Sequence, residues 1–263
     1  MAKPALRAVV VVYLALLVIW PVGLVAYNTF ADGTEALETA LTDPVVLNAL
    51  WLTAQVAFTA VIINTVFGVG VSILLVRHRF PGRRLLSLLL DLPLSVSPVV
   101  VGLAIVLVYG GVDGWFGPSL EAAGFQVVFA MPGMVLATVF VALPLVIREV
   151  VPVLEEIGDD QEQAARTLGA SGLQVFTRIT LPAIRWAVVY GVVLSLARSL
   201  GEFGAVKIVS GNLINRTQTA TLVVEQKYQD FEQSTAYATA FLLAFAAVLC
   251  LVVVSIIRPK EGS

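Results

Sequence analysis

Six long runs without a single Asp, Glu, Lys or Arg restrict what this 263-residue chain can fold into. They cover residues 8–31, 44–76, 92–112, 122–147, 186–197 and 233–257. About 20 consecutive apolar residues cross a bilayer as a helix, because a helix satisfies its own backbone polar groups where no water is available. Together with a mean hydropathy of +0.93, the runs indicate an integral membrane protein.

The fifth run is the shortest, and an ion pair is expected to extend it. Arg198 and Glu202 lie four residues apart, so they can pair on one face of a helix that continues to about Ala205. The sequence therefore predicts an all-α helical bundle that forms a single membrane domain over residues 1–263. Its six transmembrane helices are expected at about residues 8–30, 48–76, 88–110, 128–148, 183–205 and 234–257.

The basic residues set the orientation of the bundle, because Lys and Arg accumulate in the short loops on the cytoplasmic side. On one side of the predicted spans lie Lys3, Arg7, Arg77, Arg79, Arg83, Arg84, Arg148, Arg166, Arg178, Arg185, Arg258 and Lys260. On the other side lie only Lys207, Arg216 and Lys227. Both termini are therefore predicted to be cytoplasmic, and the first run is expected to be retained rather than cleaved as a signal peptide.

The longest cytoplasmic connection, residues 158–181, has the pattern of two short helices rather than of a loop. Asp160 can cap a first helix over residues 161–168 with Gln163 as its third residue, and Gly169 supplies a stop. Ser171 and Gln174 repeat the capping spacing for a second helix that is expected to end near Thr180. Two capped helices can transmit a partner's displacement; the alternative is a passive interfacial helix on lipid.

This connection resembles the EAA loop of binding-protein-dependent ABC importer permeases. The resemblance rests on Gln163-Ala164-Ala165, on Gly169 and on Ile179-Thr180-Leu181-Pro182. It implies that the segment docks on a separate ATPase, with coupling residues Glu162, Gln163, Ala164, Ala165, Gly169, Ser171, Leu181 and Pro182. Gln163 departs from the Glu that the family usually has, so any ion pair to the ATPase would be weaker or supplied by Glu162.

Three further stretches look like the W-type permease of sulfate/thiosulfate importers. They are residues 79–83 (RFPGR), residues 91–93 with 97–103 (DLP and SPVVVGL), and residues 198–205 (RSLGEFGA). Molybdate and tungstate permeases share a version of residues 198–205, but the sequence of the third span favours sulfate. The resemblance implies the type I importer permease fold and a multi-pass location in the bacterial cytoplasmic membrane.

The same resemblance implies the partners of the chain. They are a homologous T-type permease, two copies of an ABC ATPase that uses ATP and Mg, and an extracytoplasmic sulfate-binding protein. The chain itself is expected to be no enzyme and to bind no cofactor, since the sequence has no Gly-x-x-x-x-Gly-Lys-Ser/Thr loop. Membrane lipid is the remaining contact, and a net charge of −2 offers no basic field for nucleic acid.

A divalent oxyanion needs a polar route, because stripping its water in hydrocarbon would cost tens of kcal/mol. Ser195, Arg198, Ser199 and Glu202 share one predicted helical face and are the leading pathway candidates. Arg198 would attract the anion, and Glu202 would keep it from being held too tightly. The alternative is that the two charges pair, within the chain or across subunits, and only fix helix packing.

The third span carries the other pathway candidates, Ser95 and Ser97, next to two prolines. Pro93 and Pro98 interrupt backbone hydrogen bonding and indicate either a gate or a kink. Asp91 would repel sulfate, so it is not assigned to binding and a cationic or hydroxyl neighbour is expected beside it.

Catalytic and metal sites are not expected. His78 lies between Arg77 and Arg79, away from any cluster of ligands, and Cys250 is alone, so no thiol pair can hold a metal. The rival functional classes are a secondary transporter that uses Asp91, Arg198 and Glu202 as an ion relay, and a membrane enzyme or assembly subunit without transport. The capped segment argues against the first, and the missing catalytic cluster and the polar stripe argue against the others.

Overall fold

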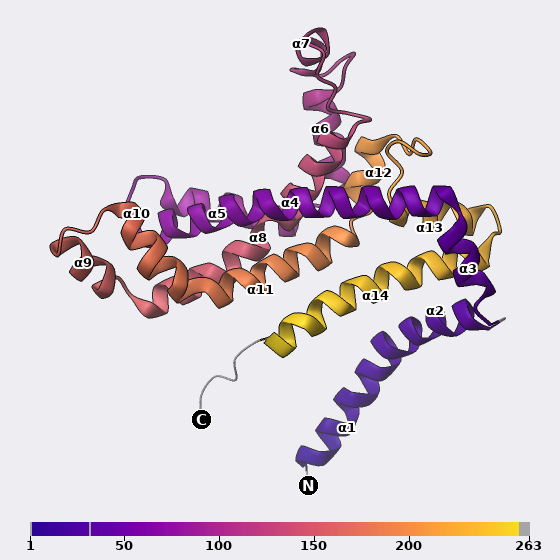
Figure 1. Ribbon diagram of the computed structural model, residues 1–263, viewed down its shortest axis with the longest axis horizontal. Coiled ribbons are helices and arrows are strands. Elements are labelled where there is room, and N and C mark those ends of the chain that lie inside the picture. Colours follow the sequence, from indigo (N-terminus) through magenta and orange to yellow (C-terminus); the bar gives the residue numbers. More distant parts are fainter. Residues whose placement is uncertain (1, 32, 258–263) are drawn as a thin grey trace.

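The computed structural model describes residues 2–31 and 33–257, and these residues form helices and connections with no strand among them. The long helices lie side by side along the longest axis of the molecule (Figure 1). The bounds of the elements, in chain order, are α1 Ala2–Leu14, a π-helical turn Ala15–Ile19, α2 Trp20–Phe30, α3 Glu35–Thr42, α4 Pro44–Arg77, α5 Arg83–Ser95, α6 Pro98–Tyr109, α7 Gly117–Ala122, α8 Met131–Ile157, α9 Asp160–Thr167, α10 Gly172–Val175, a second π-helical turn Phe176–Thr180, α11 Leu181–Leu200, α12 Gly204–Ser210, α13 Ala220–Gln229 and α14 Gln233–Ile257.

Five helical segments are long and apolar enough to cross a membrane, and a sixth is reached if the bent pair α5 and α6 counts as one span. The five are Val9–Phe30, Pro44–Arg77, Met131–Ile157, Gly172–Leu200 and Gln233–Val252. The prediction of an all-α membrane bundle with six spans is therefore confirmed, with the third span broken. The basic residues Arg258 and Lys260, used to orient the chain, lie outside the described residues.

Close packing of α4, α8 and α11 forms the centre of the bundle, and two glycines make it possible. A Cβ atom on Gly68 of α4 would lie 2.8 Å from Val146 Cγ1 of α8, and one on Gly191 of α11 would lie 2.9 Å from Val146 Cα. Small residues let helix backbones approach within van der Waals contact, which is the main source of attraction between helices in a bilayer. Val69, Val146, Val150, Leu154 and Ile184 fill the buried space around this contact.

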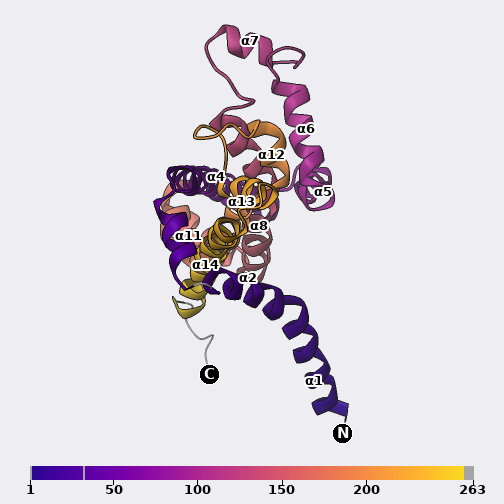
Figure 2. The same ribbon diagram turned by 90° about the vertical axis from the view of Figure 1, so that its right-hand side faces the viewer.

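The first span packs differently from the others. Its C-terminal half, α2, contacts α14, where the Phe30 and Phe241 rings meet edge to face at 5.2 Å. Its N-terminal half, α1, leaves the bundle (Figure 2). Within Val9–Phe30, none of the residues in an apolar stretch of 18 is buried by the rest of the chain. An apolar helix that its own chain leaves uncovered must be covered by lipid or by another subunit.

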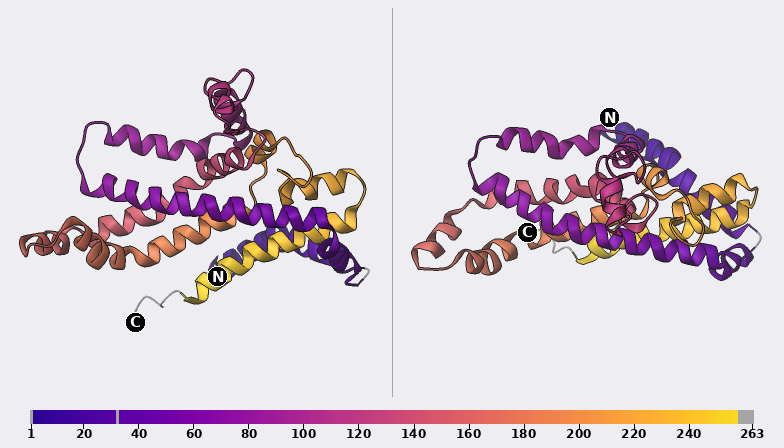
Figure 3. Two further views of the ribbon diagram at one scale, coloured as in Figure 1. Left: turned by 45° about the horizontal axis from the view of Figure 1, so that its top comes forward. Right: turned by 90° about the horizontal axis from the view of Figure 1, so that it is seen from above.

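The third span is broken by a turn of 112° between α5 and α6. Val96 and Ser97 are extended between the two helices, with ψ of 135° and 134°. Pro98 causes this, because a proline ring excludes the helical conformation from the residue before it. The span predicted at residues 88–110 is therefore interrupted at Pro98, one of the two prolines that indicated a gate or a kink. The helix α5 packs on α8, whereas α6 turns away to pack on α12 (Figure 3).

Candidate functional site

The connection between α8 and α11 forms a compact helical element, close to the predicted boundaries 158–181. The helix α9 lies between Gly158 and Gly169, whose φ angles of +64° and +88° lie in the left-handed region that favours glycine. Gly169 therefore ends the helix as expected. The predicted cap is wrong by one residue: Asp159 occupies the cap position without a side-chain bond, and Asp160 is the first helical residue.

The second half of the connection is continuous with the next span. Ser171 and Gln174 form the predicted capping box, with Ser171 N–H donating to Gln174 Oε1 at 2.8 Å and Gln174 N–H donating to Ser171 Oγ at 3.4 Å. The helix that they start does not end near Thr180. It passes through the π-helical turn directly into α11, so Pro182 lies inside a continuous helix, immediately after the turn in which the regular α-helical hydrogen-bond pattern is already interrupted.

The tip of this element is exposed and partly apolar. Leu168 and Leu173, on either side of Gly169, are 89% and 73% exposed, and Gln163 and Ala164 are exposed on α9. Ala165 is half-buried, whereas Leu181 and Pro182 lie exposed at the start of α11. Large apolar side chains with this exposure on a polar helical element are typical of a protein–protein contact.

Glu162 differs from its neighbours because it lies inside the subunit, with only 6% of its surface exposed. Both carboxylate oxygens accept from Arg77 Nε at 3.2 Å, and the Thr180 hydroxyl donates to Oε1 at 2.9 Å. Arg77 also donates to the carbonyl oxygens of Leu154 at 2.9 Å and Gly158 at 2.7 Å. This Arg77–Glu162 cluster joins α4, α8, α9 and the second π-helical turn, which leads into α11.

The cluster changes how Glu162 and Gln163 are interpreted. Sequence reasoning considered Glu162 as a substitute for the family's Glu in an ion pair with an ATPase, but such a pair would require breaking the buried contact with Arg77. Gln163 is the exposed member of the two. The signal that sequence reasoning missed is Arg77, which it used only to orient the first cytoplasmic loop.

The predicted pathway stripe on α11 is mostly inside the subunit. Ser195, Ser199 and Glu202 are buried, whereas the Arg198 side chain is 38% exposed. The Ser199 hydroxyl donates to the Ser195 carbonyl oxygen at 2.7 Å. The Ser195 hydroxyl has no partner among the described residues, and neither polar atom of the amide of buried Asn64 on α4 has one.

Glu202 does not continue α11, which ends at Leu200, so the predicted extension to Ala205 is wrong. Its carboxylate pairs with Arg198 Nη1 at 2.8 Å and accepts from Ala205 N–H at 3.0 Å, at the start of α12. An acidic side chain suits this place, because the first amides of a helix lack partners and carry partial positive charge. The ion pair that the packing alternative invoked is thus present inside the chain.

The candidates of the third span lie at its break. Ser95 ends α5 and Ser97 precedes α6, and both are exposed. Asp91 has the cationic neighbour that was expected: Arg148 of α8 donates to Asp91 Oδ1 from Nη2 at 3.0 Å and from Nε at 3.3 Å. Sequence reasoning had treated Arg148 only as a marker of the cytoplasmic side.

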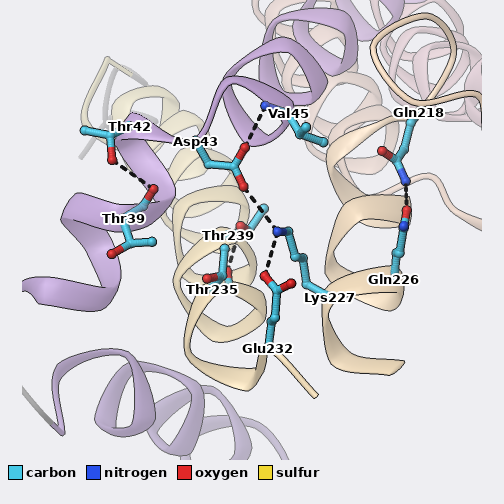
Figure 4. Close-up of polar contacts among 10 residues, drawn as sticks. All are labelled: Thr39, Thr42, Asp43, Val45, Gln218, Gln226, Lys227, Glu232, Thr235 and Thr239. Atoms are coloured by element: carbon cyan, nitrogen blue, oxygen red, sulfur yellow. Dashed lines mark hydrogen bonds and ion pairs between the residues drawn. The ribbon is translucent and has the colours of Figure 1, made fainter. Parts of the chain in front are cut away.

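A charged cluster at the opposite end of the bundle ties the outer elements together (Figure 4). Lys227 of α13 pairs with Asp43 at 3.2 Å and with Glu232 at 2.6 Å, and Asp43 also accepts from Val45 N–H at the start of α4. Burial alone would raise the pKa of Asp43, but the Val45 amide and Lys227 hold it below its usual 3.8. The bond to Glu232 and the pair with Asp43 raise the pKa of Lys227 above 10.5 against the effect of burial.

Metal-binding geometry does not occur in the part of the chain that the structure describes, where no group of three or more His, Cys, Asp or Glu side chains comes together.

Comparisons with known proteins agree with this geometry. Residues 64–259 match the model of the family described as binding-protein-dependent transport system inner membrane component. The chain is 46% identical over 260 residues to the sulfate transport system permease protein CysW of Synechocystis sp., covering 99% of this chain and 94% of that protein. It is 39% identical over 222 residues to the sulfate transport system permease protein CysT of Salmonella typhimurium, covering 84% and 80%.

A solved structure shows the same fold. It is a bacterial alginate ABC transporter in complex with a periplasmic protein that carries an alginate pentasaccharide; one of its chains matches this one with a TM-score of 0.81 at 15% identity, covering 100% of this chain and 96% of that chain. At this identity the likeness concerns the fold alone.

Proposed function

Because the chain belongs to the family of binding-protein-dependent transport system inner membrane components, we propose that it is a sulfate-translocating permease subunit of an ATP-driven importer. The observation that carries the proposal is the similarity of nearly the whole chain to sulfate permeases, in a fold that presents a rigid cytoplasmic element at residues 158–181. Thiosulfate is proposed as a second substrate, since it is also a tetrahedral divalent oxyanion.

The coupling step follows from the way that α9 and α10 are held. In the proposed complex the exposed side chains Gln163, Leu168 and Leu173 contact the ATPase. Movement of this contact passes into α11 through the continuous helix that begins at the Ser171 capping box, and into α4 through the Arg77–Glu162 cluster. A stiff connection is needed, because a mobile loop would absorb the displacement.

The energy source is assigned to another protein. We propose that two copies of an ABC ATPase bind ATP and Mg²⁺ and hydrolyse the nucleotide, while this chain supplies no catalytic residue. Similarity to both CysW- and CysT-named permeases supports pairing with a homologous T-type subunit, and an extracytoplasmic sulfate-binding protein would deliver the anion to the face that carries α3, α7 and α13.

The roles of the pathway residues belong to the same proposal. Arg198, with its partly exposed guanidinium, would attract the anion in the outer half of the route, and Glu202 would limit how tightly it is held. Ser195 and Ser199 are buried near Arg198 on α11, and the Ser199 hydroxyl donates to the Ser195 carbonyl oxygen close to the end of this helix. Ser95 and Ser97, exposed at the break of the third span, would offer hydroxyl donors to a partly dehydrated anion.

The test is reconstitution of the chain in liposomes with its T-type partner, the ATPase and the binding protein. Uptake of labelled sulfate is expected to require both ATP and the binding protein, and excess thiosulfate should compete better than molybdate. Uptake driven by an ion gradient without ATP, or competition by molybdate alone, would contradict the proposal.

A further inference from the structure

The Asp91–Arg148 pair is a charged contact between α5 and α8 that the proposed function does not use. Arg77 marks the cytoplasmic end of α4, and its bond to the Leu154 carbonyl oxygen places Leu154 of α8 at the same level. Arg148 lies six residues nearer the middle of α8, or about 9 Å at 1.5 Å per residue. Asp91 lies eight residues, about 12 Å, along α5 from its cytoplasmic start at Arg83. Both charges therefore lie about 9–12 Å in from the cytoplasmic ends of α4 and α5, directly beside the uncharged runs 92–112 and 122–147.

Both side chains are open to the surroundings of the single subunit, with 59% of Arg148 and 53% of Asp91 exposed. Charged groups that directly adjoin an apolar span avoid the hydrocarbon; they face water or a protein partner. In an importer built from two permease subunits, the surface that is both open to water and next to the partner subunit is the one that lines the translocation route. This step rests on the proposed function.

The surroundings of the pair suit an anion more than a second helix. Asp91 and Arg148 line a cavity of about 240 Å³ together with Ser87, which lies one helical turn before Asp91. The remaining walls are apolar side chains of α4, α5 and α8, among them Leu75, Leu90 and Ile147. The cavity thus combines one guanidinium, one hydroxyl and one displaceable carboxylate in an otherwise apolar lining.

The geometry of the pair leaves donors for a ligand. Arg148 reaches one oxygen of Asp91 with Nε and Nη2, whereas a guanidinium carries five N–H donors in a fork that matches an oxyanion. Because more than half of the side chain is exposed, further donors are accessible from the cavity. A tetrahedral divalent anion carries more charge than Asp91 and can accept bidentate bonds from the same fork.

We propose that Arg148 is the cytoplasmic-side oxyanion site of the translocation route, with Asp91 as its displaceable counter-charge and Ser87 as an additional donor. When the site is empty, Asp91 holds the guanidinium in place. When sulfate arrives, it takes the guanidinium from Asp91, and the freed carboxylate repels the bound anion. Return of Asp91 to Arg148 then favours release to the cytoplasm, so the site binds the anion without trapping it.

Uptake by the reconstituted importer tests the site through charge-altering variants. Arg148→Gln is expected to lower labelled sulfate uptake at least tenfold. Asp91→Asn is expected to lower both the maximal rate and the apparent KM, because the anion is then held and released slowly. Arg84→Gln, on the same helix as Asp91 but outside the cavity, is the matched control and should transport like the original chain.

The charge-exchanged double variant Arg148→Asp with Asp91→Arg separates an anion site from a packing contact. It restores an ion pair but moves the cation to α5, so uptake should stay at least tenfold low although the subunits co-purify in normal amounts. Restored uptake in this variant would overturn the proposal. Arg148→Lys, which keeps the charge but loses the fork, should fall between the original and Arg148→Gln; full activity would also overturn the assignment.

A labelling experiment tests the site without transport. With Cys250→Ser as background, Ser87→Cys in the assembled complex should react with an anionic thiol reagent, and millimolar sulfate should slow the reaction at least threefold. No reaction, or a reaction that sulfate leaves unchanged, would overturn the site. Failure of the proposed function is a different result, because the original chain would then take up no sulfate in any condition that includes ATP and the binding protein.

Discussion

Removing one charge from the Arg77–Glu162 cluster should loosen the coupling segment while the spans stay folded. Glu162→Gln keeps the size of the side chain and one oxygen that can accept from Thr180 or Arg77. It removes the carboxylate that faces Arg77 Nε through two oxygens at 3.2 Å, in a place where both side chains are less than a tenth exposed. The guanidinium then stays buried with only the carbonyl oxygens of Leu154 and Gly158 as strong acceptors.

The size of the effect follows from what is lost and what remains. Breaking a buried ion pair costs about 3–5 kcal/mol, and a hydrogen bond to a charged group contributes about 1.5–3 kcal/mol. Arg77 keeps two backbone acceptors, and the substituted amide side chain can keep one bond. The expected cost is therefore in the lower part of the second range, about 2 kcal/mol. At about 1.4 kcal/mol per factor of ten, local opening of α9 becomes roughly 30-fold more frequent.

Hydrogen exchange in the purified complex measures this opening directly. Amides within α9, such as that of Gln163, which donates to the Asp159 carbonyl oxygen, should exchange about 30 times faster in Glu162→Gln. Amides in the middle of α8 should be unchanged, and fewer sulfate ions should be imported per ATP hydrolysed. The matched control is Glu155→Gln, an exposed carboxylate next to Leu154 on α8, which should behave like the original chain.

Protection of α9 within threefold of the original in Glu162→Gln would refute the reasoning. It would mean that the contacts of α9 with the second π-helical turn hold the segment without the ion pair. The same conclusion would follow if Glu155→Gln loosened α9 equally, because the effect would then come from the loss of any nearby negative charge rather than from the buried contact.

Three further changes have outcomes that the structure sets. In Gly169→Leu the new side chain has free space, but the residue must adopt φ +88°. About 1–2 kcal/mol of backbone strain should then distort the tip and lower the sulfate imported per ATP, while membrane insertion stays normal. Normal coupling would contradict this. Gly191→Ala places a methyl group 2.9 Å from Val146 Cα. It should lower the free energy of unfolding in detergent by about 1–3 kcal/mol and the melting temperature with it, whereas Gly70→Ala, with open space around the new methyl group, should not. Because the folded-state pKa of Asp43 is lowered, the stability it contributes is present above its unfolded value and is lost as pH falls below 3.8 through the folded pKa. Asp43→Asn can still cap α4 but should lack this loss on acidification in a pH series of melting temperatures, and an unchanged acid dependence would refute the role of the pair with Lys227.

Much of the bundle could be predicted, because uncharged runs indicate the transmembrane helices and basic loops indicate the cytoplasmic side of the membrane. The capping box at Ser171 and the stop at Gly169 were predictable for a similar reason, since both depend on local backbone chemistry. The end of α11 was not, because a four-residue spacing shows that Arg198 and Glu202 can pair but not whether helix continues between them. In the structure the pair forms across the end of the helix, where Glu202 also accepts from Ala205 N–H.

The contacts that matter most for coupling join residues far apart in the sequence. Glu162 and Arg77 are 85 residues apart, and Asp91 and Arg148 are 57 apart. No local pattern distinguishes a Glu that faces inward from the exposed carboxylates before it, or an Arg that marks the membrane boundary from one that fills a cavity. Only the folded structure brings α4 to α9 and α5 to α8, where these charges meet.

The helices α4, α8 and α11 form a stiff unit that carries the coupling segment, whereas the third span is broken, and the proposed anion site lies between the two. Contact of Gly68 and Gly191 with Val146 locks α4, α8 and α11 together, and the unbroken helical stretch Gly172–Leu200 connects the coupling segment to the far side of the membrane over about 43 Å. The third span is held less tightly: α5 packs on α8 less extensively than α4 and α11 do and has no close glycine contact with it, and two extended residues separate α5 from α6. We therefore expect a displacement of residues 158–181 to move α8 relative to α5. Arg148 and Asp91 lie on these two helices, so a movement that starts at the ATPase contact reaches the anion site as a change in the distance between its cation and its counter-charge.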